Sequence, residues 1–169
     1  MKFAKAFLLL LVLAACAFLV YRALQLAQDS GPEKSGPDNA AQCDQGLWTH
    51  VYHPARLKVL DPCISVTGIV ESVRKEADGD YHVLFRLDQE FESLLNEKNI
   101  SRQNGDLVLE PICQDTVRQP DAVDSCSGYE GPYFEIEIGR RYLASGPYVY
   151  DADHGWNEVH PVNSMRPIE

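Results

Sequence analysis

The placement of acidic residues divides this chain into two parts with different surroundings. All 25 aspartates and glutamates lie after position 28, whereas the first 28 residues contain only the cations Lys2, Lys5 and Arg22. Between the second lysine and this arginine, Ala6 to Tyr21 is an uncharged run. A cationic start followed by an apolar run is typical of export signals. We therefore expect residues 1–27 to be a signal peptide or membrane anchor that delivers the remainder out of the cytoplasm.

The fate of this leader has three readings. Leu13-Ala14-Ala15-Cys16 resembles a lipobox, which predicts cleavage before a lipidated Cys16. An uncleaved anchor is the rival, because the uncharged run of 16 residues would form about 24 Å of helix and apolar residues after Arg22 extend it. Simple cleavage is the third. All three place the remainder in the periplasm or outside the cell, in a bacterial cell envelope.

Composition predicts a linker and one acidic domain. Residues 28–42 hold two Gly-Pro pairs and no large apolar side chain, so we expect a flexible linker. Residues 43–169 can then form one domain. From Asp29 onward, 25 acids against 12 lysines and arginines give a formal charge of −13. Such a surface disfavours non-specific nucleic-acid binding, which depends on cations that neutralise phosphates.

Four cysteines remain after the leader, and an even number in an oxidising compartment favours two disulfides. We favour Cys113–Cys126, which closes a short loop, and Cys43–Cys63, which ties the N-terminal arm to the first strand. A four-cysteine zinc site is the alternative, but the chain has no pair of cysteines separated by two residues.

Hydrophobic patterning predicts a mainly β domain. Alternating and β-branched residues indicate five strands, and Gln89 to Asn96 has the apolar spacing of one short helix. The expected strands are Ile64 to Val73, Tyr81 to Leu87, Asp106 to Cys113, Arg141 to Tyr150 and Trp156 to Val162. Gly68 predicts a bulge or bend in the first strand, and Gly146-Pro147 predicts a break in the fourth.

The pattern of strands and glycines resembles an OB-fold. The resemblance lies in Gly68-Ile69-Val70, Asp78-Gly79-Asp80-Tyr81-His82 and Gly155-Trp156-Asn157-Glu158-Val159-His160-Pro161. It is similar to the OB-like domain of exported bacterial proteins that have no established activity. The resemblance implies a small five-stranded barrel after the anchor and linker, but no reaction.

Aromatic and cationic side chains in the expected strands are candidates for ligand binding. OB-folds stack bases or sugars on aromatic side chains, although the same side chains can simply fill a barrel. The candidate ligand-binding residues are Trp156, Tyr148, Tyr150, Arg74 and Arg86. Together with Lys75, Arg140 and Arg141, the two arginines could form an anion site if they gathered on one face.

Histidines suggest a second kind of site. If the N-terminal arm packs beside the last hairpin, His50, His53, Glu158 and His160 could bind zinc or another divalent metal. Hydrogen bonds from these histidines to backbone carbonyls are the alternative. Asp78, Asp80 and His82 could form an acid–base or calcium group, but an Asp-Gly turn also explains these aspartates.

Three functions follow from these patterns. The first is a non-enzymatic, membrane-tethered OB-like binding module for a protein, glycan or oligonucleotide, with no cofactor. The second is a metal-dependent hydrolase or nuclease that uses the histidine–carboxylate group. The third is an assembly protein without a small ligand. The sequence names neither the ligand nor the oligomeric state.

Overall fold

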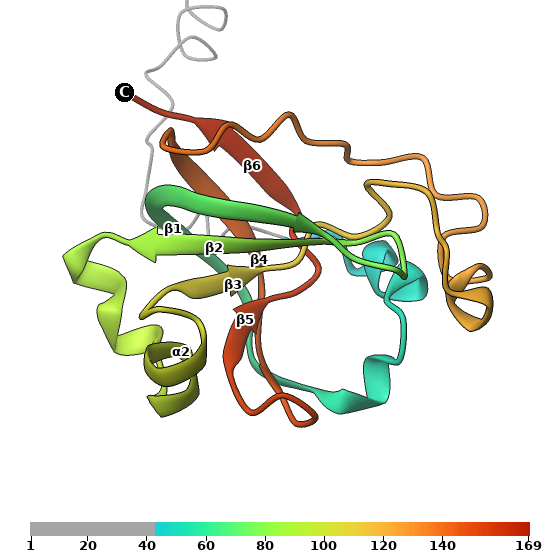
Figure 1. The fold of residues 1–169 in the computed structure, drawn as a ribbon, viewed down its shortest axis with the longest axis horizontal. Coiled ribbons are helices and arrows are strands. Elements are labelled where there is room, and N and C mark those ends of the chain that lie inside the picture. Colours follow the sequence, from blue (N-terminus) through green and yellow to red (C-terminus); the bar gives the residue numbers. More distant parts are fainter. Residues whose placement is uncertain (1–42) are drawn as a thin grey trace, which may run out of the picture. The chain divides into compact units, whose positions relative to one another are not determined.

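The computed structural model describes residues 43–169, which form a mainly β unit (Figure 1). The expected leader, the linker and Cys16 lie outside the described residues. In the range 43–169, no helix has the length and apolar character needed to cross a bilayer.

Six strands form one sheet in the order β1-β2-β3-β5-β4-β6. They are β1 (Leu57–Lys75), β2 (Tyr81–Leu87), β3 (Leu107–Leu109), β4 (Arg141–Asp151), β5 (Asn157–Val159) and β6 (Ser164–Pro167). Strand β1 also pairs with β4, so the pairings β1-β2-β3-β5-β4 close into a ring. The β3–β5 pair is parallel and the other pairs are antiparallel.

The long strand β1 closes this ring because its two halves have different partners. Its first half pairs with β4 and its last part pairs with β2, and Figure 1 shows the strand curving between them. Gly68 lies where both pairings overlap, opposite Leu87 and Tyr142. A Cβ atom at Gly68 would stand 2.3 Å from the carbonyl oxygen of Arg86. The glycine therefore permits a close strand approach, while the register shift lies between Val70 and Ser72.

The inner face of the sheet carries the main apolar core. In β2, Val83 and Phe85 are fully buried, and the core continues through Leu109, Tyr142 and Val159. The alternate residues of β2 face the other way, as the period of two in a strand requires. One face of the sheet therefore supplies the apolar burial, and the other carries most of the polar side chains.

A second, smaller apolar cluster covers part of the outer face. The 3₁₀ helix η1 (Gln45–His50) places Leu47 there, and the chain after β3 adds Ile112 and Tyr129. Both disulfides have the expected pairing: Cys43–Cys63 and Cys113–Cys126 are each bonded. The second disulfide closes residues 113–126, which we call the disulfide loop.

Several elements differ from the sequence expectation. The expected helix at Gln89 to Asn96 is the 3₁₀ helix η3 (Gln89–Leu94), and a true helix, α2 (Glu97–Arg102), follows it. Apolar spacing did not predict helix α2, because polar groups hold this helix in place. Asn96 and Asn99 form a capping box, and the Asn99 amide donates to the carbonyls of Asp106 and Asn157.

Strand lengths differ as well. Strand β3 has three residues instead of eight, since Pro111 lacks an N–H and Cys113 has a positive φ of 53°. Strand β4 continues through Gly146-Pro147. Pro147 has no N–H to donate, but it lies opposite the register shift between Asp61 and Ile64 of β1, where the regular pairing is interrupted. Strand β5 is shorter than expected, and β6 was not expected at all.

Candidate ligand-binding face

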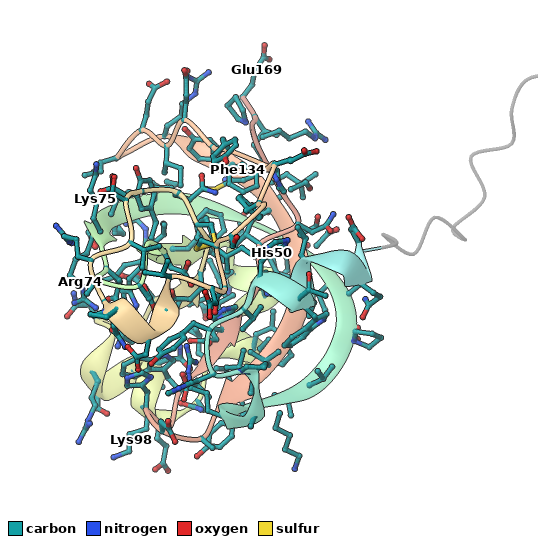
Figure 2. The ribbon with its side chains drawn as sticks, turned by 90° about the vertical axis from the view of Figure 1, so that its right-hand side faces the viewer. His50, Arg74, Lys75, Lys98, Phe134 and Glu169 are labelled. Atoms are coloured by element: carbon teal, nitrogen blue, oxygen red, sulfur yellow. A yellow bond between two sulfur atoms is a disulfide. The ribbon has the colours of Figure 1, made fainter. Side chains whose placement is uncertain are left out.

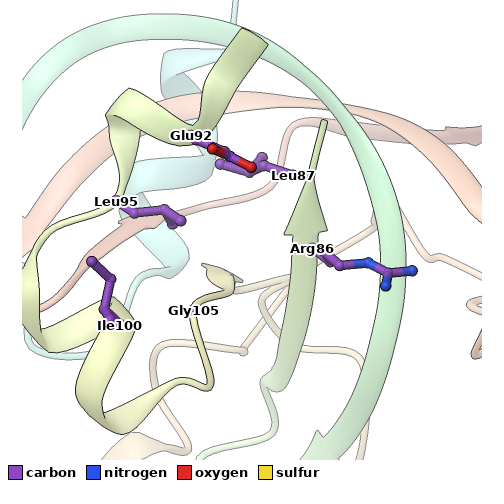
Figure 3. Close-up of a pocket in the computed structure, with 6 residues that line it drawn as sticks. All are labelled: Arg86, Leu87, Glu92, Leu95, Ile100 and Gly105. Atoms are coloured by element: carbon purple, nitrogen blue, oxygen red, sulfur yellow. The ribbon is translucent and has the colours of Figure 1, made fainter. Parts of the chain in front are cut away.

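A hollow opens beside the end of β2, between η3 and α2. It has a volume of about 300 Å³ and is lined by Arg86, Leu87, Glu92, Leu95, Ile100 and Gly105. Figure 3 shows Leu95 and Ile100 pointing into this space, while Arg86 points to the other side of β2. Ile100 is 62 % exposed, which is unusual for a large aliphatic side chain and leaves apolar surface available to a ligand.

A second hollow shares Arg86 and lies on the outer face of the sheet. It has a volume of about 330 Å³ and is lined by Glu71, Ser72, Leu84, Arg86, Asn104 and Asp106. Burial, followed by the charge of Glu71, raises the pKa of Asp106 to about 6. We call the two hollows together the Arg86 groove. The first hollow offers Glu92 beside apolar side chains, and the second offers Glu71, Asp106 and the Arg86 guanidinium.

The cations expected to form an anion site are each held by a carboxylate. Arg74 lies 2.6 Å from Glu76. Figure 2 shows Arg74 and Lys75 near each other at one edge of the molecule, with Lys98 at some distance from both. The full set of pairs is Arg74–Glu76, Lys75–Asp115, Arg86–Glu71, Arg140–Glu137 and Arg141–Asp88. The positive charge is therefore dispersed and neutralised, which disfavours a polyanionic ligand.

The candidate aromatic residues are engaged within the fold. The Trp156 indole N–H donates to Glu158 at 2.9 Å, and its ring stacks on His154 at 4.5 Å. The Tyr148 hydroxyl donates to the Leu94 carbonyl at 2.5 Å, which links β4 to η3. Tyr150 is half-buried and pairs with Asn157 across β4 and β5. A role of these three aromatic residues in ligand stacking stays a prediction.

The four candidate metal ligands do not form one group. His50 Nδ1 lies 2.7 Å from the Ser125 carbonyl, and the ring of His53 stacks on Tyr52. Only Glu158 and His160 meet, at 3.0 Å. Within residues 43–169, only one group of three side chains of metal-ligating types has its ligand atoms within 4.8 Å of one another. This group is Asp80, Cys113 and Cys126. Two of those three carry the sulfurs of a disulfide.

A buried polar pair that sequence reasoning missed lies beside the groove. His82 Nδ1 is 2.7 Å from Glu110 Oε1, and His82 Nε2 is 3.0 Å from Gln103 Oε1. Because the Gln103 oxygen only accepts, Nε2 of His82 carries a proton, and Nδ1 forms the hydrogen bond with Glu110. Burial lowers the pKa of His82, and burial followed by the charge of Glu158 raises that of Glu110. Both shifts disfavour the charged forms of the two side chains.

A second polar group lies at the end of β4. Arg56 contacts Asp151 at 2.5 Å and Glu158 at 3.8 Å, and His154 contacts Asp151 at 2.8 Å. Burial alone would raise the pKa of Asp151, but the His154 hydrogen bond and the Arg56 charge outweigh it and lower that pKa. His160 Nε2 is buried without a hydrogen-bond partner among the described residues.

No family model, curated protein or solved structure matches this chain.

Proposed function

We propose that residues 43–169 form an OB-like barrel that works as a non-enzymatic binding module on the outer side of a bacterial membrane. The ring of pairings β1-β2-β3-β5-β4, with β3 parallel to β5, supports this reading. OB-folds are five-stranded Greek-key barrels that bind ligands on the face of strands 2 and 3 and on adjacent loops. The observation that carries the proposal is the Arg86 groove: one of its hollows lies on the face of β1 and β2, and the other lies in the connection between β2 and β3.

Export is supported by two independent features. The leader is cationic and then apolar, as in export signals. Two disulfides fit an oxidising compartment, since thiols in the cytosol are usually kept reduced. The membrane attachment through residues 1–27 and the envelope location belong to this proposal.

The groove favours a cationic, partly apolar ligand. Glu71, Glu92 and Asp106 line it, whereas its one arginine is held by Glu71 at 3.0 Å. The neighbouring hollow adds Asp88 and Glu90, and its Arg141 is likewise paired with Asp88. Leu87, Leu95 and Ile100 add apolar surface to the hollow that contains Glu92. A segment of a partner protein with lysine or arginine beside a leucine-like side chain satisfies both features, because charge steers the encounter and apolar burial stabilises the complex.

The experiment is a binding titration of the full-length chain in detergent. A fluorescent peptide of alternating lysine and leucine is the probe, and a glutamate–leucine peptide, an oligothymidylate and a chitin oligosaccharide are the comparisons. We expect binding of the lysine–leucine peptide alone, and weaker binding as salt rises. Binding of the oligothymidylate or the oligosaccharide without the peptide would contradict the ligand class.

Matched variants separate a site from general charge attraction. Ile100→Ser in the groove should weaken peptide binding about tenfold, from lost apolar burial. Ile138→Ser is the control, because Ile138 is similarly exposed at 65 % and lies elsewhere. Glu92→Lys should weaken binding about five- to tenfold, with Glu135→Lys as its control. Equal effects of groove and control variants would overturn the proposal.

A further inference from the structure

A buried carboxyl group lies against the disulfide that closes the disulfide loop. Asp80, at the start of β2, is only 3 % exposed. Its Oδ1 accepts a hydrogen bond from the backbone N–H of Cys113 at 2.7 Å. An oxygen of this carboxyl lies within 4.8 Å of both Cys113 Sγ and Cys126 Sγ. A titratable oxygen therefore stands beside both atoms of a bond that thiols can break.

The two cysteines differ in their exposure to solvent. Cys113 is buried at 6 % exposure, whereas Cys126 is half-buried and lies among exposed residues of the loop. The tip of the β1–β2 turn packs against Cys126, whose Sγ is 3.8 Å from the Asp78 carbonyl. An incoming thiolate would therefore reach Cys126, and Cys113 would be the sulfur that leaves.

The other disulfide is a natural reference within the same molecule. Cys43 is buried and Cys63 is half-buried, so the two disulfides have a similar exposure pattern. The carboxylate beside Cys63 is Asp61, which is exposed and accepts from the Cys63 N–H at 3.0 Å. Within residues 43–169, no carboxylate forms a comparable close trio with the Cys43 and Cys63 sulfurs.

We propose that Cys113–Cys126 is an exchange-competent disulfide, in which an external thiolate attacks Cys126 and Asp80 donates a proton to Cys113. The reaction partner is a small thiol or a protein dithiol of the same compartment. This activity is independent of the ligand proposed for the Arg86 groove.

The exchange balances in atoms and charge. The thiolate sulfur bonds to Cys126 Sγ, the S–S bond breaks, and its electron pair leaves on Cys113 Sγ. The Asp80 carboxylic acid then gives its proton to that thiolate, which leaves a Cys113 thiol and an Asp80 carboxylate. With a dithiol, its second thiolate attacks the mixed disulfide and releases Cys126 as a thiolate. Solvent then protonates this thiolate and the Asp80 carboxylate. The dithiol is oxidised to a disulfide and the protein disulfide is reduced to two thiols.

The charge state of Asp80 suits this role. Burial raises the pKa of Asp80 to about 8; the charge of His160 opposes this rise and that of Asp78 adds to it. The titratable groups around Asp80 come from four elements: Asp78 in the turn, Glu110 after β3, Tyr129 after the disulfide loop and His160 after β5. Near neutral pH the Asp80 carboxyl therefore holds a proton that it can give to the leaving Cys113 thiolate.

The test is a comparison of the two disulfides in one full-length chain. Samples treated with dithiothreitol are quenched by alkylation, and each cysteine is mapped by mass spectrometry. After correction for the thiolate fraction of the reagent, we expect Cys113–Cys126 to react about tenfold faster than Cys43–Cys63 at neutral pH, as general acid catalysis requires. This advantage should fall as pH rises through about 8. Equal rates, or a ratio that does not change with pH, would overturn the proposal.

Two variants and a trapping reaction locate the proton donor. Asp80→Asn keeps an acceptor for the Cys113 N–H but has no acidic proton, so it should lose the rate advantage. Asp78→Asn, two residues away in the same turn, should keep it. Glutathione should form its mixed disulfide on Cys126. Adducts on Cys113, or an unchanged rate in Asp80→Asn, would contradict the assigned roles. The wild-type pH profile decides the question if Asp80→Asn does not fold.

Discussion

The two faces of the sheet use buried residues in different ways. The inner face buries Val83, Phe85 and Leu109 and gains its stability from apolar contact. The outer face buries Asp80, His82 and Glu110, whose burial has to be offset by hydrogen bonds and by neutralisation. The inner face thus holds the fold together, while the outer face holds buried groups that can titrate.

The largest expected change in the free energy of unfolding comes from a comparison of two adjacent residues of β2. Phe85→Ala should reduce the free energy of unfolding by about 3–5 kcal/mol, because it leaves a cavity in the apolar core. Leu84→Ala, on the half-buried outer side, should cost less than about 1.5 kcal/mol. Denaturant unfolding of both variants measures the difference. Similar losses for the two variants would remove the distinction between the faces.

The next effect concerns the protonation state of Glu110. Glu110→Gln keeps an N–H donor toward His82 Nδ1 and should change the unfolding free energy by less than about 1 kcal/mol. His82→Ala removes the hydrogen-bond partner that Glu110 and Gln103 share, and should reduce the free energy of unfolding by about 1–3 kcal/mol. Denaturant unfolding at neutral pH compares the two. A large loss in Glu110→Gln would mean that Glu110 is ionised.

The third effect is the pH dependence of stability. The pKa of Asp80 is raised to about 8 and that of Glu110 is also raised, so both groups stabilise the fold fully below their unfolded pKa values. That stabilisation is lost as pH rises toward the folded values, at up to ~1.4 kcal/mol per pH unit per group. Asp151 acts oppositely, because its lowered pKa stabilises the fold above its unfolded value.

We therefore expect the unfolding free energy to fall between about pH 5 and pH 8, and Asp80→Asn to flatten part of this decline. Denaturant titrations at several pH values measure it, with Asp78→Asn as the control. Stability that is constant or increases over this range would contradict the burial of protonated carboxyl groups.

The smallest expected effect on stability lies in the groove. Arg86 is 58 % exposed and pairs with Glu71 at the surface, so Arg86→Ala should change the unfolding free energy by no more than about 0.5 kcal/mol. The same variant frees Glu71 and should strengthen binding of the lysine–leucine peptide. Denaturation and the binding titration, run on one preparation, test both parts. A weakened peptide affinity would show that Arg86 itself contacts the ligand.

Local patterning in the sequence predicts much of the sheet. Strand β2 has the expected bounds, because its alternation of apolar and polar side chains matches its two faces. Both disulfides have the pairing that the sequence favoured, from the short loop between Cys113 and Cys126 and from the tie of the N-terminal arm to the first strand. Helix α2 and β6 were missed, since α2 depends on asparagine caps and β6 on pairing with β4, not on apolar periodicity.

The outer face was harder to predict. His82 and Glu110 meet only because β2 pairs with β3, and Glu158 joins them because β3 pairs with β5 in parallel. That register depends on the whole fold and is absent from any local pattern. Arg86 was a candidate from the sequence and lies in the groove. Of the apolar side chains in that hollow, Leu95 lies in the segment expected to be a helix, whereas Ile100 comes from α2, whose spacing gave no signal.

The central claim is that the Arg86 groove binds ligand, and amide chemical-shift mapping tests it most directly. Isotope-labelled full-length chain would be titrated with the lysine–leucine peptide. We expect the largest shifts at residues 84–87 and 92–105, with smaller changes at residues 71–72. Shifts that concentrate around Tyr148, Tyr150 and Trp156, or that spread evenly over the acidic surface, would contradict the claim.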